Sequence, residues 1–276
     1  MSQTRIAKRF EILKAEGRSA FVTFVTAGDP DLETSKKLLS GMAKAGADIL
    51  EIGMPFSDPM ADGPAIQLGS QRALAAGMTL KGVLSLVSDL RQSDDETPIV
   101  LMGYYNPIYS YGVDKFLNDA KAAGVDGFIV VDLPPEEERE FAIPAKEAGL
   151  DFIYLTTPTA DDERLEKIGR RASGFIYYVS ITGVTGTASA TSSDVAAAVK
   201  RIKNTSDLPV AIGFGINTPA QAQEMASVSD AAVVGSAIVK KIAGNLDENG
   251  KAKAGLVDDV LSYVSELAGG VKAAKA

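Results

Sequence analysis

The segment DILEIGMPFSDPMADGP, residues 48–64, begins with a short apolar run and continues into a loop rich in proline and acidic residues. Its first six residues are typical of a buried β-strand, in which successive side chains alternate between two faces. Ile49 and Glu51 then share one face, and Leu50 and Ile52 share the other. Glu51 is therefore expected to point inward near the strand's end, where burial raises the pKa of a carboxyl group toward the range of a general acid or base.

Similar apolar runs recur along the chain, each bounded by turn residues and followed by a longer stretch of helical character. Their richness in Val and Ile, without sustained polar alternation, predicts strands covered on both faces, as in parallel sheets. The eight predicted strands are Ala20–Ala27, Asp48–Gly53, Pro98–Met102, Gly127–Asp132, Asp151–Leu155, Gly174–Ser180, Pro209–Gly213 and Ala231–Gly235.

The segments between these strands have apolar positions at helical spacing. Three of them end in glycine just before a strand, as in the joint Ala45-Gly46-Ala47-Asp48, and such a glycine is typical of a helix C-terminus. The predicted helices are Leu32–Ala45, Leu80–Ser93, Val113–Ala123, Glu136–Glu147, Ala160–Arg171, Ser193–Asn204 and Thr218–Ser227.

Eight strand–helix units predict an α/β fold, a single-domain (β/α)8 TIM barrel over residues 1–276, with an N-terminal helix at about residues 4–16. An open doubly wound sheet is the alternative. Such a sheet usually carries a GxGxxG motif or a P-loop after an early strand, and the sequence has neither.

The residue types restrict the chemistry. The chain has no His and no Cys, which excludes disulfides, thiolate nucleophiles and Cys/His zinc sites and favours carboxylates for acid–base catalysis. Its net charge of −8, without a basic cluster, argues against nucleic acid and anionic membranes as partners. No signal-type segment or membrane-length apolar run is evident, so we expect a cytoplasmic protein.

Glycines follow the last three predicted strands, where a barrel commonly binds phosphate. Gly186, Gly213 with Gly215, and Gly235 with Ser236 would present backbone N–H groups, and a short helix beginning near Ser236 would add its positive end. Each glycine could instead serve a tight turn with positive φ. Residues 181–193 are mostly small, which suits a mobile lid, although an inert flexible loop has the same composition.

The segment EIGMPFSDPMADGPAIQ, residues 51–67, resembles a long motif of the tryptophan synthase alpha family, and the resemblance continues through TAGDP, MGYYNPI, DLPPEE, SITGVTG, GFGI and GSAIV. It covers essentially the whole chain. It implies a carbon–carbon lyase that cleaves indole-3-glycerol phosphate by a retro-aldol reaction to indole and glyceraldehyde 3-phosphate, in tryptophan biosynthesis. Two positions depart from the family pattern: Ile181 stands where some relatives have arginine, and Val131 replaces a common proline.

The resemblance also implies roles at matching positions. Glu51 would be the general acid–base group, and Asp62 would stay ionised and accept a hydrogen bond from the indole N–H. Thr185 in the lid would orient Asp62. The residues expected to bind phosphate are Gly186, Gly215, Gly235 and Ser236. The residues expected to line the indole pocket are Phe24, Ile66, Tyr177 and Phe214.

Each of these roles has a plainer alternative. An aromatic residue in a barrel strand is more often part of the core than a ligand contact. Glu51 could belong to an internal ion pair, and Asp62 could be a turn residue or the N-cap of a helix that begins near Pro64.

The resemblance further implies a partner, the pyridoxal-phosphate-dependent beta subunit, in an α2β2 heterotetramer. The partner would receive indole directly and would hold the cofactor, so that this chain carries no cofactor and no metal. The alternative for the prolines of this region is that they only end loops. The residues expected at the interface are Pro55, Asp58, Pro59, Asn106 and Pro134.

Two other functional classes stay open. A different phosphosugar lyase or isomerase would keep the phosphate-binding loops, but a Schiff-base aldolase needs a lysine at a strand end, and strand six and its neighbours show none. A non-catalytic binding barrel is the second. It predicts that Glu51→Gln leaves the role intact, whereas an enzyme would lose turnover with a small change in substrate affinity.

Overall fold

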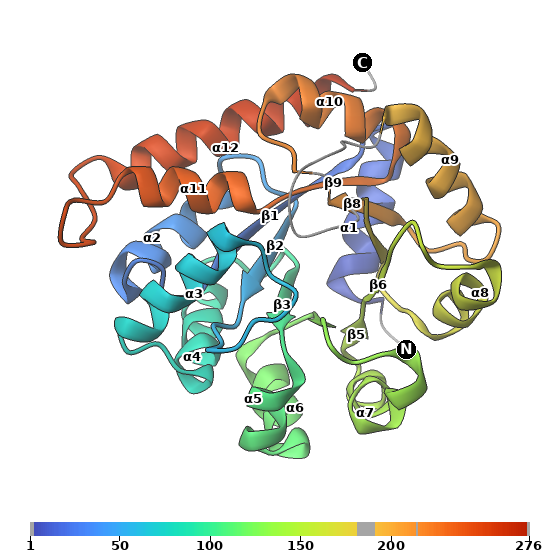
Figure 1. Cartoon of the computed structure of the whole chain (residues 1–276), viewed down its shortest axis with the longest axis horizontal. Helices are drawn as coiled ribbons and strands as arrows, with labels where there is room; N and C mark the ends of the chain where they lie inside the picture. Colours follow the sequence, from blue (N-terminus) through green and yellow to red (C-terminus); the bar gives the residue numbers. More distant parts are fainter. Residues whose placement is uncertain (1–2, 181–190, 214, 275–276) are drawn as a thin grey trace.

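The computed structural model describes residues 3–180, 191–213 and 215–274 of the chain. Parallel strands gather at the centre of the molecule and helices surround them (Figure 1). The strands form one sheet in the order β5-β4-β3-β2-β1-β9-β8-β7-β6. Their bounds are β1 (Ala20–Thr26), β2 (Ile49–Gly53), β3 (Ile99–Gly103), β4 (Gly127–Val130), β5 (Asp151–Phe152), β6 (Tyr154–Thr156), β7 (Ile176–Val179), β8 (Val210–Gly213) and β9 (Ala231–Val234).

The two ends of this sheet belong to one stretch of chain. β5 pairs with β4, β6 pairs with β7, and only Ile153 separates β5 from β6. Together these two short pieces act as one strand, so the sheet closes into a barrel of eight strand positions. The prediction of a (β/α)8 barrel is confirmed, and Asp151–Leu155 is the one predicted strand that the structure divides.

Helices connect the strands and cover the outside of the barrel (Figure 1). Several begin at a Thr or Asp whose side chain accepts a backbone N–H of the first turn, as Asp31 does from Thr34. Their bounds are α1 (Arg5–Ala15), α2 (Leu32–Met42), α3 (Pro64–Ala75), α4 (Leu80–Arg91), α5 (Tyr105–Tyr111), α6 (Val113–Ala123), the 3-10 helix η1 (Pro135–Glu140), α7 (Ala142–Glu147), α8 (Asp162–Arg171), α9 (Ser192–Lys203), α10 (Pro219–Val228), α11 (Ser236–Gly244) and α12 (Leu256–Ala273).

The single helix predicted over Glu136–Glu147 is wrong. The chain instead forms η1, leaves helical geometry at Phe141, with φ −152° and ψ −43°, and begins again as α7. Pro144 explains the break, because a proline inside a helix has no N–H to donate and clashes with the carbonyl four residues earlier. With α7 beginning at Ala142, Pro144 lies in the first turn, where its missing N–H removes no helical hydrogen bond.

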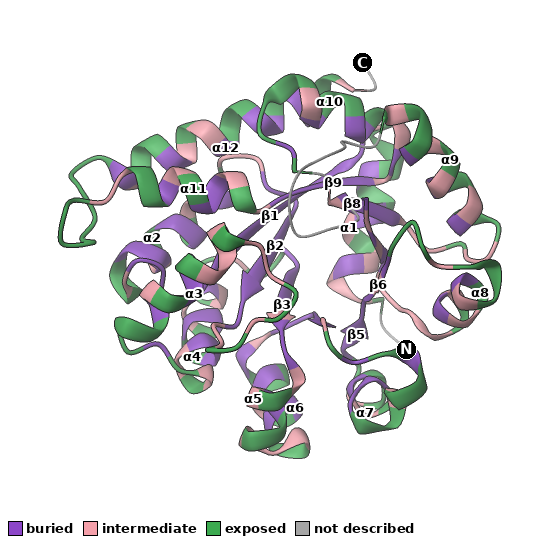
Figure 2. Ribbon diagram, in the orientation of Figure 1, coloured by how far each residue is buried: buried purple, intermediate pink, exposed green. Residues whose placement is uncertain are grey.

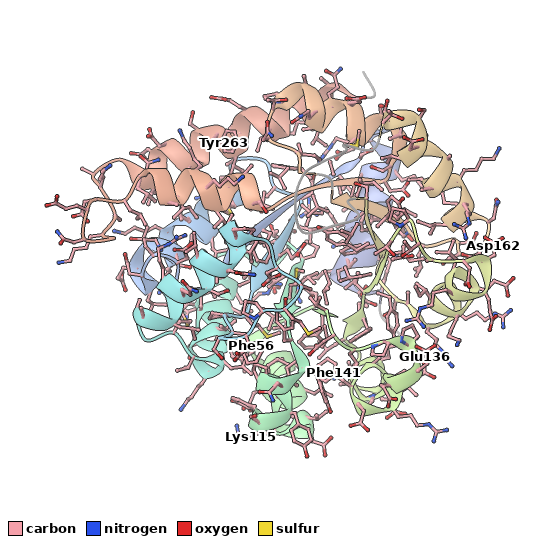
Figure 3. All side chains as sticks on the ribbon, viewed as in Figure 1. Phe56, Lys115, Glu136, Phe141, Asp162 and Tyr263 are labelled. Atoms are coloured by element: carbon pink, nitrogen blue, oxygen red, sulfur yellow. The ribbon has the colours of Figure 1, made fainter. Side chains whose placement is uncertain are left out.

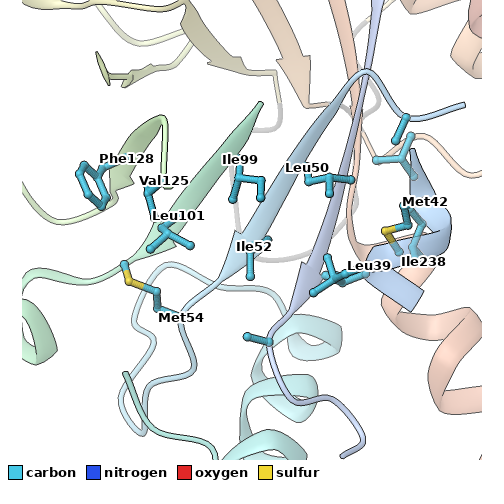
Figure 4. Packing of buried hydrophobic residues seen from close by; sticks show 14 of the residues in the cluster. Leu39, Met42, Leu50, Ile52, Met54, Ile99, Leu101, Val125, Phe128 and Ile238 are labelled. Atoms are coloured by element: carbon cyan, nitrogen blue, oxygen red, sulfur yellow. The ribbon is translucent and has the colours of Figure 1, made fainter. Parts of the chain in front are cut away.

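Side chains of the strands divide between two apolar clusters. Val22, Ile49 and Val100 face the barrel interior, whereas their neighbours Leu50 and Ile52 pack outward against the helices. Figure 4 shows this outer packing, and Figure 2 shows the buried strands surrounded by helices whose outer faces are exposed. The alternation predicted for residues 48–53 therefore holds, and it places Glu51 on the inner side of the barrel.

The end of the barrel at which the strands begin is closed. Helix α1 packs Ile6, Phe10 and Leu13 against the interior cluster, with the rings of Phe10 and Phe175 at 5.9 Å. Asp126, directly before β4, accepts hydrogen bonds from the Ile99 N–H at 2.7 Å and from Arg91 at 2.6 Å, and it pairs with Arg5 of α1 at 3.0 Å. This end of the barrel is therefore filled by side chains.

Within the described ranges, no single helix has the length and apolar character needed to cross a bilayer. Only α3 and α4 taken together meet that test, and they form a pair bent by 94°.

Candidate active site

One cavity of about 1090 Å³ opens at the carboxyl ends of the strands. Side chains from β1, β2, β3, β7 and β9 form its floor, and the loops after β2 and β8, together with α11 and α12, form its walls. All the described residues predicted to act on or bind a substrate line this cavity. They are Phe24, Glu51, Asp62, Ile66, Tyr177, Gly215, Gly235 and Ser236.

Glu51 lies on the cavity floor with only 1% of its surface exposed. Its Oε2 atom has no hydrogen-bond partner among the described residues, and no ion pair there includes Glu51. Burial, and secondly the charge of Asp62, raises the pKa of Glu51 to about 8. A carboxyl group of this kind is protonated at neutral pH and can donate a proton into the cavity.

Asp62 lies in the loop between β2 and α3, at the wall of the same cavity. Burial raises the pKa of Asp62 to about 6, and a hydrogen bond from the Tyr104 hydroxyl acts in the opposite direction. Helix α3 takes Gly63 as its N-cap, so Asp62 is not the capping residue. At neutral pH Asp62 is therefore mostly ionised beside a mostly protonated Glu51, an arrangement that separates the roles of two carboxyl groups.

Two aromatic residues, Phe24 and Tyr177, line the cavity floor, and glycines make room for them. A Cβ atom on Gly53 would lie 2.6 Å from Cζ of Phe24, and one on Gly213 would lie 2.7 Å from Cε1 of Tyr177. Any larger residue at either glycine would displace a ring. Burial, and secondly the charge of Glu51, raises the pKa of Tyr177 well above its usual range, so its hydroxyl stays protonated.

The far wall of the cavity is built around a helix N-terminus. Helix α11 begins at Ser236, directly after Gly235, and no side chain caps it. Gly215, with φ +60°, exposes the backbone of the loop after β8 to the same region. Tyr263 of α12, labelled in Figure 3, donates a hydrogen bond at 2.8 Å to the backbone carbonyl of Asn217 and so holds this loop. Free N–H groups at a helix start favour an anion.

Four predictions lie wholly or mostly outside the described residues. They concern Gly186 at the phosphate site, Phe214 in the indole pocket, Thr185 in the lid, and the lid itself, of which residues 181–190 are not described.

The residues predicted at an interface do not line the cavity. They stand in the loops after β2 and β4 and in helix α5 after β3. Asp58, Asn106 and Pro134 are exposed, and Pro55 and Pro59 are half-buried. Two large apolar side chains of these segments are also exposed, Met60 in the loop after β2 at 83% and Tyr109 of α5 at 67%. Met60 also borders the cavity.

Sequence reasoning missed several residues of the site. Tyr104 was not singled out, because its partner Asp62 comes from a different loop and no spacing links them. Lys240, Lys241 and Tyr263 also line the cavity. The two lysines follow Ser236 by one helical turn, a spacing that could have identified them once the start of α11 was known.

No group of three or more Asp, Glu, His or Cys residues in the described part of the chain is arranged to hold a metal ion.

Comparison with known proteins gives one consistent result. The family model described as "Tryptophan synthase alpha chain" matches residues 10–268. The fold is similar to tryptophan synthase subunit alpha from Legionella pneumophila, at 38% identity and a TM-score of 0.90, covering 99% of this chain and 100% of that one. A protein of Aquifex aeolicus matches at 39% identity and 0.86, covering 97% and 99%. Mycobacterium tuberculosis tryptophan synthase matches at 33% identity and 0.87, covering 98% and 99%.

Proposed function

The chain belongs to the tryptophan synthase alpha chain family, and we propose that the cavity of its barrel is where it carries out that family's reaction. The chain is a carbon–carbon lyase that cleaves indole-3-glycerol phosphate to indole and glyceraldehyde 3-phosphate in tryptophan biosynthesis. The observation that carries the assignment of the site is that Glu51, Asp62 and the start of α11 border one cavity. Such a cavity accepts an elongated molecule with phosphate at one end.

The reaction breaks the bond between indole C3 and the glyceryl carbon that bears a hydroxyl group. A proton must reach C3, which makes the ring cationic, and the hydroxyl must lose its proton as its oxygen becomes the aldehyde. The electron pair of the broken bond then restores the aromatic ring. No redox partner is needed, since one proton is added and one removed.

Glu51 suits the proton transfers. With a pKa of about 8 it holds a proton at neutral pH, and it lines the cavity with a buried Oε2 that has no hydrogen-bond partner among the described residues. We assign it the delivery of the proton to C3, after which its carboxylate takes the hydroxyl proton. The charge that Glu51 then carries also favours the cationic ring.

Asp62 suits a different role. It is mostly ionised above its pKa of about 6, and an ionised carboxylate beside the indole N–H accepts that hydrogen bond more strongly as the ring becomes positive. Phe24, Ile66 and Tyr177 supply the apolar surround of the ring. Gly215, Gly235 and Ser236 supply backbone N–H donors and a helix N-terminus that can bind the phosphate. Gly186 would be the fourth phosphate-binding residue.

As an alpha subunit the chain pairs with a beta subunit. We propose an α2β2 heterotetramer in which pyridoxal phosphate belongs to the beta subunit alone, and in which the loops after β2 and β4 and helix α5 after β3 form the contact. A cytoplasmic location, and the absence of a cofactor from this chain, stay predictions.

The proposed contact can be tested by reversing a charge. Asp58→Lys should weaken binding of the beta subunit, whereas Glu11→Lys on α1, at the closed end of the barrel, should not.

The function is tested by incubating the purified chain with indole-3-glycerol phosphate, alone and with a beta subunit, and following indole release. We expect indole under at least one condition. Glu51→Gln and Asp62→Asn should each lower kcat by roughly 10²-fold or more with a small change in KM. The matched control is Glu248→Gln, an exposed carboxylate that does not line the cavity. No indole under both conditions refutes the assignment.

A further inference from the structure

Two lysines border the end of the cavity at which α11 begins. Lys240 and Lys241 line the cavity together with Ser236 and Ala237 of the same helix. Among the described residues that line it, they are the only Lys or Arg side chains. Neither belongs to the sequence features that indicated the phosphate-binding loops.

Helix geometry directs Lys240 toward the first turn of α11. Residues four apart lie on the same face, one above the other, and Cα–Cβ bonds tilt toward the N-terminus of the helix. Four residues span about 6 Å along the axis, which a lysine side chain covers. Lys240 therefore overlies Ser236, and Lys241 overlies Ala237, so that both ammonium groups can reach an anion held at the start of the helix.

The charges of these lysines are not used within the described protein. The ion pairs found there engage lysines such as Lys36, Lys167 and Lys203, but neither Lys240 nor Lys241. Lys240 is exposed and Lys241 half-buried, so both stay open to the cavity. An unpaired cation on a cavity wall adds little to stability, and its placement is better explained by what enters the cavity.

The positive charge of the two lysines would offset repulsion between the protein and a substrate that carries phosphate. The chain carries a net charge of −8, and the cavity itself contains Glu51 and Asp62. A phosphate dianion that approaches such a surface is repelled unless cations at the entrance offset the field. The backbone N–H groups at the start of α11 recognise the shape of a phosphate but carry only partial charge.

We infer that Lys240 and Lys241 are specificity-determining residues, which bind the phosphate of the substrate as a dianion and accelerate its entry into the cavity. The inference rests on the proposed function. Because the lysines act at the end of the molecule that does not react, they bind the ground state and the transition state equally, and their loss changes KM rather than kcat.

The test compares two double variants of the full chain with equal loss of charge. In Lys240→Gln/Lys241→Gln both cavity lysines are neutral, and in Lys8→Gln/Lys14→Gln two exposed lysines of α1, at the closed end of the barrel, are neutral. We expect the cavity variant to raise KM for indole-3-glycerol phosphate about 5- to 30-fold with kcat within about twofold. The α1 variant should match the wild type.

Salt provides a second measurement. Between about 50 and 500 mM NaCl the KM of the wild type should rise, because exposed charges are screened, and the rise should largely disappear in the cavity variant. A third measurement is independent of turnover: calorimetric titration with inorganic phosphate should give weaker binding to the cavity variant than to the α1 variant.

The outcomes separate the two proposals. If the wild type releases indole but the cavity variant keeps the KM, the salt dependence and the phosphate affinity of the α1 variant, the inference about the lysines is overturned and the proposed function stands. If the wild type releases no indole, the proposed function fails, and the phosphate titration still decides whether the lysines bind an anion.

Discussion

The hydroxyl oxygen of Tyr104 accepts a hydrogen bond at 3.0 Å from the backbone N–H of Ala61. The same hydroxyl donates to the carboxylate of Asp62, the next residue. One buried side chain from the end of β3 therefore holds both the backbone and the charged group of the loop after β2. Tyr104 is a positioning residue, because it acts on Asp62 and does not line the main cavity.

Replacing Tyr104 with phenylalanine should shift the pH dependence of the reaction. Without the donated hydrogen bond the pKa of Asp62 rises above about 6, so ionised Asp62 is lost at a higher pH. We expect the acidic limb of kcat/KM to move upward by up to about one pH unit, the equivalent of one hydrogen bond. Tyr105→Phe, whose hydroxyl reaches Glu140 on the surface, is the control. An unchanged acidic limb would contradict the assignment.

The wild-type enzyme should show a bell-shaped dependence of kcat/KM on pH. The proposed mechanism needs ionised Asp62 and protonated Glu51, so activity should fall below about pH 6 and again above about pH 8. The two limbs belong to the pair rather than to either residue alone, because the two groups interact. Initial rates at low substrate concentration across pH 5 to 9 provide the measurement, and a rate that kept rising past pH 9 would be inconsistent with a protonated Glu51.

Glu51→Gln should stabilise the protein while it removes activity. The pKa of Glu51 is about 8 in the folded chain and ordinary in the unfolded chain, so between those values the folded state binds more protons and stability falls as pH rises. Removing the carboxyl group removes that loss, which amounts to up to about 3 kcal/mol at pH 7. Urea unfolding at pH 5 and pH 7 measures it. The gain should be larger at pH 7, and Glu248→Gln should show none.

Tyr263→Phe should weaken substrate binding without slowing the chemical step. Its hydrogen bond to the Asn217 carbonyl joins α12 to the loop that carries Gly215. Losing it should cost about 1 kcal/mol of stability and raise KM severalfold, while kcat stays close to that of the wild type. Steady-state kinetics with Tyr109→Phe as an exposed control decide the matter. A fall in kcat with constant KM would show that Tyr263 acts elsewhere.

Asp126→Ala should destabilise the fold. Its buried carboxylate accepts hydrogen bonds from Arg91, Arg5 and the N–H of Ile99. Removing it leaves the largely buried Arg91 without its counter-charge. We expect a loss of about 3 kcal/mol in the free energy of unfolding. Asp95→Ala, at the exposed partner of Arg5, should cost less than about 1 kcal/mol. Kinetics of the folded variant should be unchanged, because the cluster lies at the closed end of the barrel.

Much of this architecture could be predicted from the sequence because the signals are local. Runs of Val and Ile identify the strands, and the alternation of side chains along β2 turns Glu51 inward whatever the rest of the chain does. Direction follows from the barrel, since the loops after parallel strands all meet at one end.

The remainder depends on contacts between distant parts of the chain. Asp62 and Tyr104 stand 42 positions apart in the sequence, and no motif in either segment predicts their contact. Tyr263 reaches the loop after β8 from α12, which no motif connects with it. Two local signals also conflict near Pro144. The spacing of apolar residues predicted one helix, but a proline disrupts the interior of a helix, and the chain forms η1 and α7 instead.

The packing of α1 against the interior cluster determines how a small molecule can reach the cavity. Because Ile6, Phe10 and Leu13 fill the end at which the strands begin, the barrel is closed there and has no channel through it. Under the proposed function, substrate would enter and products would leave at the opposite end, so a protein bound there would control access to the cavity and would be the first to receive the indole.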